Sequence, residues 1–284
     1  MKQNAWVEIT KPRLVSLVLW TVGAGYLLAS RGPINFPLLL KTLLGTALVA
    51  AGSMVLNQYM ERSNDALMKR TENRPLPSER LKPRTALIFG MGLSVIGIST
   101  LALGVNFLCA FLAAGTLIIY LLIYTPLKTK TPLCTLLGAI PGAIPPMIGW
   151  TAVKGDLGWE AWILFAILFM WQLPHFFAIA WIYREDYSKA GFRMLSVVDP
   201  SGKRIGQEMM IYTLAVLLAS LLPAVTGMAG LVYYGGAFLL GIWLLAASFR
   251  TAFQLDSRAR SFFKQSVLYL SLLFLLLLLD KKLS

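Results

Sequence analysis

The sequence predicts an all-α integral membrane protein of nine transmembrane helices around a central cavity, with a cytoplasmic N-terminus. Hydrophobic residues make up 57% of its 284 positions and charged residues only 14%, a composition outside the range of soluble domains. Apolar runs recur that can cross about 30 Å of hydrocarbon at about 1.5 Å per helical residue. Lysine and arginine also gather in alternate loops. Together these observations predict one polytopic membrane domain over residues 1–284.

Nine apolar runs qualify as membrane spans. They are Leu14–Ser30, Leu38–Met60, Thr85–Leu103, Phe107–Leu127, Leu133–Val153, Ala161–Tyr183, Met209–Thr226, Gly230–Phe249 and Phe262–Leu279. A short break near Val105 separates the third run from the fourth. No small-residue cleavage site follows the first run, so we expect an uncleaved first helix.

The distribution of cations sets the expected orientation. All but five of the 26 lysines and arginines fall on one side of the nine runs, and this side is expected to be cytoplasmic. The other side holds Arg31, Lys41, Lys154, Lys281 and Lys282. Orientation and anionic ligands together explain the net charge of +13, so we expect no nucleic-acid partner.

Glycine and proline interrupt the fifth run. Gly138, Pro141, Gly142, Pro145 and Pro146 all lie inside it, so this helix must be kinked or partly unwound. Irregular backbone at membrane depth is tolerated only when it is buried in protein or faces a cavity. A cavity for a large ligand is the preferred interpretation, and simple helix packing is the alternative.

Polar side chains arrive abruptly where the second run ends. Asn57, Glu61 and Asp65 are spaced by four residues, which places them on one face of a helix. Two carboxylates one turn apart repel unless a cation lies between them, and such oxygen ligands suit Mg²⁺. Arg70 and Arg74 follow, with forked donors that fit phosphate oxygens. The pattern indicates a metal-bridged diphosphate site, and solvation of an ordinary helix end is the alternative.

The sixth run ends in a second acidic exit. Arg184, Glu185 and Asp186 follow its last apolar residues, as the first carboxylates follow the second run. The fourth and eighth runs end without comparable acids. The two acidic exits could therefore face each other and hold separate cations on one diphosphate.

Two other features of this part of the chain are candidates for ligand binding. Lys128 and Lys130 follow the fourth run, where they can meet an anionic group or anchor the helix at the membrane surface. His175 is the only histidine and lies inside the sixth run. An ionisable residue within the membrane is a functional candidate. A neutral histidine bonded to a neighbouring helix is the alternative.

Three stretches contain all of these candidates. They read NQYMERSNDALMKRTENRPLP, YTPLKTKTPLCTLLGAIPGAIPPMIGW and WQLPHFFAIAWIYREDYSKAGFRM. They resemble the intramembrane prenyltransferases of the UbiA superfamily, and the resemblance covers nearly the whole chain. The patterns RTxxRP, PPxIGW and WQLPHF point to the branch that farnesylates heme b. These patterns are specific together and weak singly.

The resemblance implies a reaction and its setting. Farnesyl diphosphate bound with Mg²⁺ would ionise on the cytoplasmic side of the plasma membrane and alkylate a vinyl group of heme b. Addition of water would then give heme o, so heme b is a substrate and not a cofactor. The implied partners are the lipid bilayer and a downstream heme A synthase or terminal oxidase assembly. Prenylation of a quinone precursor or another aromatic acceptor is the first alternative, and transport of an anionic lipid or metabolite is the second.

The motif match also assigns residues. Asn57, Glu61 and Asp65 take the first metal position, and Asp186 with Glu185 takes the second. Both positions also carry the proposed catalytic residues. The substrate-binding set is Arg70, Arg74, Lys128, Lys130, Arg184, Tyr124, Tyr187 and His175, with His175 toward heme and Tyr124, Tyr183 or Tyr187 offering an aromatic face to the prenyl cation.

Three positions depart from the family pattern. Glu61 stands where aspartate is usual, Ser63 where a further aspartate is frequent, and Cys134 where asparagine is common. Glutamate still binds Mg²⁺, so the first change is mild. Serine at position 63 leaves the site with fewer anionic ligands, which bears on the number and affinity of metal ions.

Overall fold

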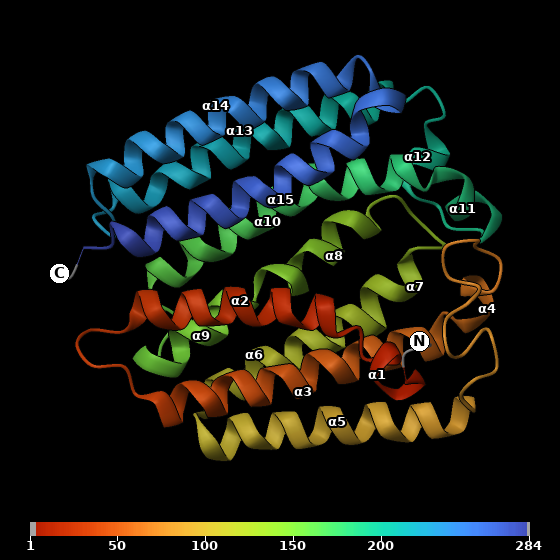
Figure 1. Ribbon diagram of the computed structural model, residues 1–284, viewed down its shortest axis with the longest axis horizontal. Coiled ribbons are helices and arrows are strands. Elements are labelled where there is room, and N and C mark those ends of the chain that lie inside the picture. Colours follow the sequence, from red (N-terminus) through yellow and green to blue (C-terminus); the bar gives the residue numbers. More distant parts are fainter. Residues whose placement is uncertain (1–3, 283–284) are drawn as a thin grey trace.

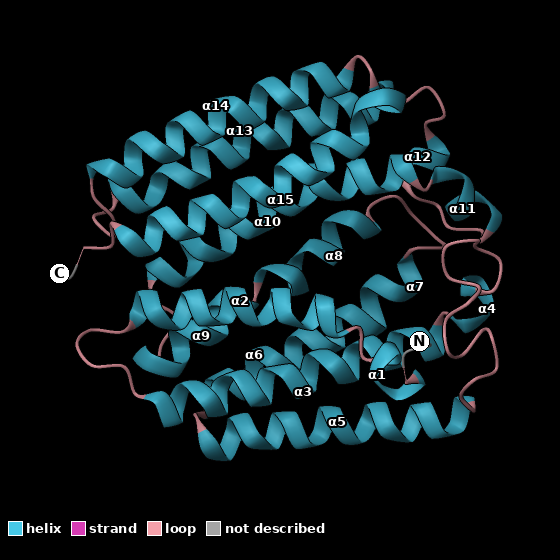
Figure 2. Cartoon of the chain, in the orientation of Figure 1, coloured by secondary structure: helices cyan, strands magenta, loops and turns pink. Residues whose placement is uncertain are grey.

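The computed structural model describes residues 4–282, and helices dominate this part of the chain (Figure 2). Nine helical segments within it are long and apolar enough to cross a membrane, which confirms the predicted number of spans. They are α2 (Pro12–Ala29), α3 (Phe36–Met60) with α4 (Arg62–Asp65), α5 (Pro83–Gly104), α6 (Phe107–Ile118) with η1 (Ile119–Tyr124) and α7 (Thr125–Leu127), α8 (Cys134–Ala143) with α9 (Pro145–Lys154), α10 (Trp159–Ile182), α13 (Lys203–Val225), α14 (Leu231–Ala252) and α15 (Leu255–Leu279).

Two of these helices begin more than one turn before the apolar runs that predicted them. The helix α13 begins at Lys203, six residues before Met209, and α15 begins at Leu255, seven residues before Phe262. Their first turns are polar, so an apolar run could not reveal them. Hydrophobicity locates the part of a helix that lies in hydrocarbon, whereas backbone hydrogen bonding sets its full length.

The two ends of the bundle differ in structure (Figure 1). The short helices α1 (Ala5–Ile9), α4, α11 (Arg184–Lys189) and α12 (Leu195–Val198) gather at one end, which we call the site end. The opposite end carries the connections at residues 30–35, 155–158 and 226–230 together with residues 280–282, and we call it the distal end. The chain thus begins at the site end and finishes at the distal end, as an odd number of spans requires.

Both predicted interruptions are present. The chain breaks at Val105, and the Asn106 side chain then caps α6 by accepting a hydrogen bond from the Cys109 backbone N–H at 2.8 Å. The fifth span divides at Ile144 into α8 and α9, because Pro145 and Pro146 cannot donate backbone hydrogen bonds to the turn before them.

The glycines near that division serve close packing. A Cβ atom at Gly142 would collide with the Gln172 side chain on α10, and one at Gly149 would collide with the backbone carbonyl of Val22 on α2. A Cβ atom at Gly25 on α2 would likewise collide with the backbone carbonyl of Pro146. At these positions the packing alternative is correct, since only a residue without a side chain lets the backbones approach.

Candidate functional site

The polar face predicted at the end of the second span lies inside the protein. Asn57 lies in the last turn of α3, Glu61 joins α3 to α4, and Asp65 ends α4. Their exposed fractions are 2%, 6% and 1%. Carboxylates at such burial need compensating charges or hydrogen bonds. The partners of these three side chains therefore define the site.

Arg74 compensates Asp65. Its Nη1 atom lies 2.7 Å from each carboxylate oxygen of Asp65 and donates to both. Thr71 adds a bond from its hydroxyl to the Asp65 backbone carbonyl, also at 2.7 Å. These bonds fold the RTENRP segment back over the end of α3, which places the arginine beside the carboxylate predicted to bind metal.

Lys128 compensates Glu61 from the exit of the fourth span. Its Nζ atom lies 2.7 Å from Glu61 Oε1, and both side chains are buried. Burial is the largest single influence on the pKa of Lys128 and would lower it, but the Glu61 carboxylate together with Tyr120 and Tyr187 outweighs burial and raises that pKa above its ordinary value. Glu61 Oε1 accepts no hydrogen bond of favourable angle within residues 4–282, so the contact is mainly coulombic.

A π-helix sets the position of Lys128. The fourth span widens into η1 just before Pro126, which lacks the N–H that a regular turn would use. The Thr125 hydroxyl donates to the Tyr120 carbonyl at 2.8 Å and accepts a bond from the Asn57 amide nitrogen at 3.1 Å. This bond leaves the amide oxygen of Asn57 for a ligand, and it ties the second span to the fourth.

The two acidic exits lie side by side, as predicted. Asp186 Oδ2 accepts a bond from the Arg70 backbone N–H at 3.4 Å, and the Asn64 amide donates to the Ala190 carbonyl at 2.8 Å. A small apolar cluster that includes Met68, Cys134, Tyr187 and Met194 packs the exits of the second, fourth and sixth spans together.

The tyrosine faces are occupied by cations of the protein. The Arg70 guanidinium carbon lies 4.2 Å from the Tyr183 ring centroid and 5.5 Å from that of Tyr187, and it also donates to the Tyr187 hydroxyl at 3.4 Å. Lys128 Nζ lies 4.6 Å from the Tyr124 centroid. These rings therefore hold the basic side chains in place, which differs from the expected contact with a prenyl cation.

Three predicted residues lie apart from this cluster. Arg184 Nη2 pairs with Asp256 at 3.0 Å, and its guanidinium covers the Trp181 ring at 4.4 Å. The Arg184 guanidinium thus pairs with Asp256 and not with a carboxylate of the acidic exits, and we leave it out of the proposed site. Glu185 and Lys130 are exposed at the surface of the site end.

His175 is held between α10 and α15. Its Nδ1 atom lies 2.8 Å from the Ser266 hydroxyl, and its ring packs against Trp171 and Phe263 at centroid distances of 4.7 and 4.8 Å. This geometry matches the alternative of a histidine bonded to a neighbouring helix. The bond occupies one ring nitrogen, so only Nε2 remains for a ligand.

Lys11 belongs to the site, although the sequence did not single it out. It precedes Pro12 and adopts a left-handed backbone conformation with φ 50°, which is uncommon for a residue with a side chain. Burial, followed by the charges of Arg74 and Lys128, lowers the pKa of Lys11 to about 7, while Asp65 and Glu61 act in the opposite direction. The only signal for it in the sequence was a lysine in the turn before the first span.

The carboxylates of the site can supply part of the coordination shell of a metal ion, and the oxygens of a bound ligand would supply the rest. In the described part of the chain, no three His, Cys, Asp or Glu side chains come close enough to form a metal centre by themselves. Among residues 4–282, the buried Glu61 Oε1 has the Lys128 ammonium at 2.7 Å but no hydrogen bond of favourable angle, and Asp65 and Asp186 present further oxygens. Mg²⁺ accepts one or two carboxylates together with phosphate oxygens, so this donor set fits a metal–diphosphate complex.

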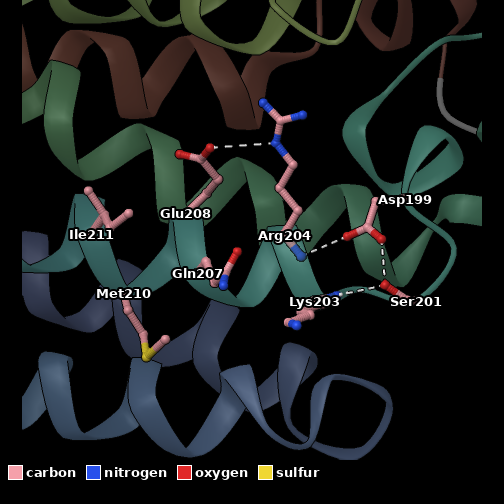
Figure 3. Close-up of a pocket in the computed structure, with 8 residues that line it drawn as sticks. All are labelled: Asp199, Ser201, Lys203, Arg204, Gln207, Glu208, Met210 and Ile211. Atoms are coloured by element: carbon pink, nitrogen blue, oxygen red, sulfur yellow. Dashed lines mark hydrogen bonds and ion pairs between the residues drawn. The ribbon is translucent and has the colours of Figure 1, made fainter.

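A large open pocket lies elsewhere, at the start of α13 (Figure 3). Its volume is about 660 Å³, and its polar residues bond mainly to one another. Asp199 accepts from the Ser201 hydroxyl at 2.6 Å and from the Arg204 backbone N–H at 2.8 Å, while Arg204 lies 3.8 Å from Glu208. These contacts explain the pocket as the cap of α13.

Comparison with known proteins identifies the family. Residues 18–277 match the UbiA prenyltransferase family. The chain belongs to the UbiA prenyltransferase family. One relative, from Solibacter usitatus (strain Ellin6076), is 47% identical over 97% of this chain and 98% of its own length, and it bears the name protoheme IX farnesyltransferase.

Solved structures of other proteins share the fold. A structure of digeranylgeranylglyceryl phosphate synthase aligns with a TM-score of 0.82 at 18% identity, covering 97% of each chain. A UbiA homologue from Archaeoglobus fulgidus bound to GPP and Mg²⁺ aligns with a TM-score of 0.69 at 15% identity, covering 96% of this chain and 99% of its own. At these identities the likeness establishes the UbiA architecture for this chain.

Proposed function

We propose that this protein transfers the farnesyl group of farnesyl diphosphate to a vinyl group of heme b. The observation that carries the proposal is the meeting of two acidic helix exits with Arg70, Arg74 and Lys128 at one end of a membrane bundle. The relative at 47% identity supports heme b as the acceptor. The UbiA structure with GPP and Mg²⁺ supports a metal-bound prenyl diphosphate as the donor.

Binding of the diphosphate exchanges partners at the site. Arg74 and Lys128 now neutralise Asp65 and Glu61, so the free site is close to electrostatic balance. Asn57, Glu61 and Asp65 would hold one Mg²⁺, and Asp186 would hold another, whereas the exposed Glu185 is left out of this ligand set. When bound, Mg²⁺ would neutralise charge on the diphosphate oxygens. Arg74 and Lys128 are then free to turn from the carboxylates toward the same oxygens.

The basic side chains stabilise the departing group. Breaking the bond between the allylic carbon and oxygen leaves its electron pair on the diphosphate. Arg70 is held over Tyr183 and Tyr187, so it needs little reorganisation to meet that charge. Lys11, in the turn before α2, adds a fourth cation when the bound diphosphate favours its protonated form, since its pKa of about 7 leaves it only partly charged in the free site. Such preorganised charges are worth several kcal/mol in a site closed to water.

The acceptor requires placement more than a base. The vinyl group of heme b attacks the allylic cation and forms a carbon–carbon bond, and water then adds to the resulting cation with loss of a proton. No strong base is needed, which agrees with the lack of any Ser/His/Asp or Cys/His arrangement in the sequence. His175 Nε2 is the candidate contact for heme.

A product assay tests the proposal. Purified protein would be incubated with heme b, farnesyl diphosphate and Mg²⁺, and the products identified by mass spectrometry. We expect heme o and diphosphate. Turnover of a quinone precursor without heme o would establish the first alternative, and flux across liposomes without any product would establish a transporter.

Two finer proposals rest on the charge distribution and the family resemblance. The excess of cations at the site end supports a cytoplasmic active site in the plasma membrane. The product is a lipophilic heme that must reach a later enzyme, which supports a downstream heme A synthase or a terminal oxidase assembly as partner.

A further inference from the structure

Trp150 ends the PPMIGW pattern, yet it lies near the distal end of the bundle, away from the acidic exits. It is 5% exposed, and its indole Nε1 is buried without a hydrogen-bond partner in residues 4–282. In two other tryptophans, the indole N–H does donate a hydrogen bond. Trp171 donates to the Ser266 carbonyl at 2.7 Å and Trp181 donates to Asp256 at 3.1 Å. An unpartnered buried N–H is uncommon and points to a missing acceptor.

The indole borders a small distal pocket lined by residues from the ends of α2, α9 and α10 and from the segment after α15. Figure 1 shows these helix ends at the distal end of the bundle. Its volume is about 40 Å³, which is room for a few water molecules or one small anionic group. It is more enclosed than the pocket at the start of α13. The same pocket is lined by Arg31, Lys154, Lys281 and Lys282, which are four of the five distal cations.

Within residues 4–282, the charges around this pocket are not balanced. Glu160 is the one carboxylate among the lining residues, against four cations. None of the four cations makes an ion pair in the described part of the chain. Lys281 Nζ instead donates to the backbone carbonyls of Leu27 at 2.9 Å and Ser30 at 3.2 Å. The pocket thus combines surplus positive charge with a buried donor, which are the requirements for binding an anion.

We propose that this pocket binds the phosphate group of an anionic phospholipid and thereby ties the end of α2 to the ends of α9 and α15. The pocket lies where membrane-length helices end, which is the depth of lipid headgroups. Exposed apolar side chains at the same end, Trp159 on α10 and Leu231 on α14, offer surface to acyl chains. A lipid therefore suits the site better than a free phosphate ion.

Thermal unfolding of the full-length protein in neutral detergent tests this assignment. The probe is phosphatidylglycerol, with inorganic phosphate in a separate arm. Trp150→Phe removes the N–H and keeps an aromatic ring, and the double variant Arg31→Met with Lys154→Met removes two charges. Lys41→Met is the matched control, because Lys41 is the distal cation that does not line the pocket. Native mass spectrometry of the same samples counts the lipid retained.

We expect phosphatidylglycerol to raise the unfolding temperature of the wild type and of Lys41→Met equally. The other two variants should need about ten-fold more lipid for the same shift, since each loses contacts to a charged group. They should also retain less lipid in the mass spectrometer. Equal lipid responses in all four proteins would overturn the proposal. An equal shift from inorganic phosphate alone would overturn the assignment to a lipid.

Discussion

Cations gather at both ends of the bundle, but the two ends differ in whether these cations form ion pairs with carboxylates. At the site end, Arg74 and Lys128 pair with buried carboxylates. At the distal end, four cations share a pocket without an ion pair in residues 4–282. The paired acids and bases of the site end can bind an anionic ligand together with its metal ions, because the acids bind the metal and the bases bind the anion. The unpaired cations of the distal end can bind an anion without a metal.

The largest expected effect tests the acids of the site end. Asp65→Asn should lower farnesyl transfer by at least about 10³-fold, because it removes a metal ligand and leaves Arg74 without its partner. The product assay measures the loss. Asp256→Asn is the control, since Asp256 also pairs with an arginine at this end but is largely exposed. Near-normal activity in the purified, folded Asp65→Asn protein would remove these carboxylates from the mechanism.

The next effect concerns the cation that was found only in the structure. Lys11→Met should raise the Kd of a non-hydrolysable farnesyl diphosphate analogue by about ten-fold, since a charged contact is lost. Calorimetric titration measures it. Lys130→Met offers a matched control, because Lys130 is exposed at the same end. If both variants bind alike, Lys11 belongs to the turn before α2 and has no contact with the ligand.

A smaller effect separates the two roles of His175. His175→Ala should raise the KM for heme b about five-fold while the KM for farnesyl diphosphate stays within about two-fold. Steady-state kinetics with each substrate varied provide the values. Ser266→Ala breaks the same hydrogen bond and keeps the ring. Parallel changes in both KM values would mark the histidine as a packing residue.

The smallest effect is expected at the distal end. Lys154→Met should leave kcat and both KM values within about two-fold of the wild type, because distant charges across the bundle are strongly screened. A marked loss of turnover would mean that the distal pocket is coupled to the site, and it would weaken the division between the two ends.

Much of this arrangement follows from local sequence. Apolar length predicted nine spans, Pro145 and Pro146 predicted the broken fifth helix, and the spacing of Asn57, Glu61 and Asp65 predicted a shared face. These features depend on residues within one or two turns of each other, where backbone chemistry dominates.

The remainder depends on tertiary contacts. Arg184 and Asp256 are distant in sequence, so their pairing could not be predicted from the exit of the sixth span alone. The occupation of the tyrosine faces by Arg70 and Lys128 has the same origin. Trp150 carried a motif signal, but its position at the distal end emerged only once α9 was placed against α2.

The wide turn at η1 carries one residue more than a regular helix would accommodate. If the same six residues, 119–124, wound as a regular α-helix, everything beyond them would swing by about 100° around the helix axis. Lys128 would then face away from Glu61, although no charged group had been altered. The π-helical winding of this one turn therefore orients Lys128 toward Glu61.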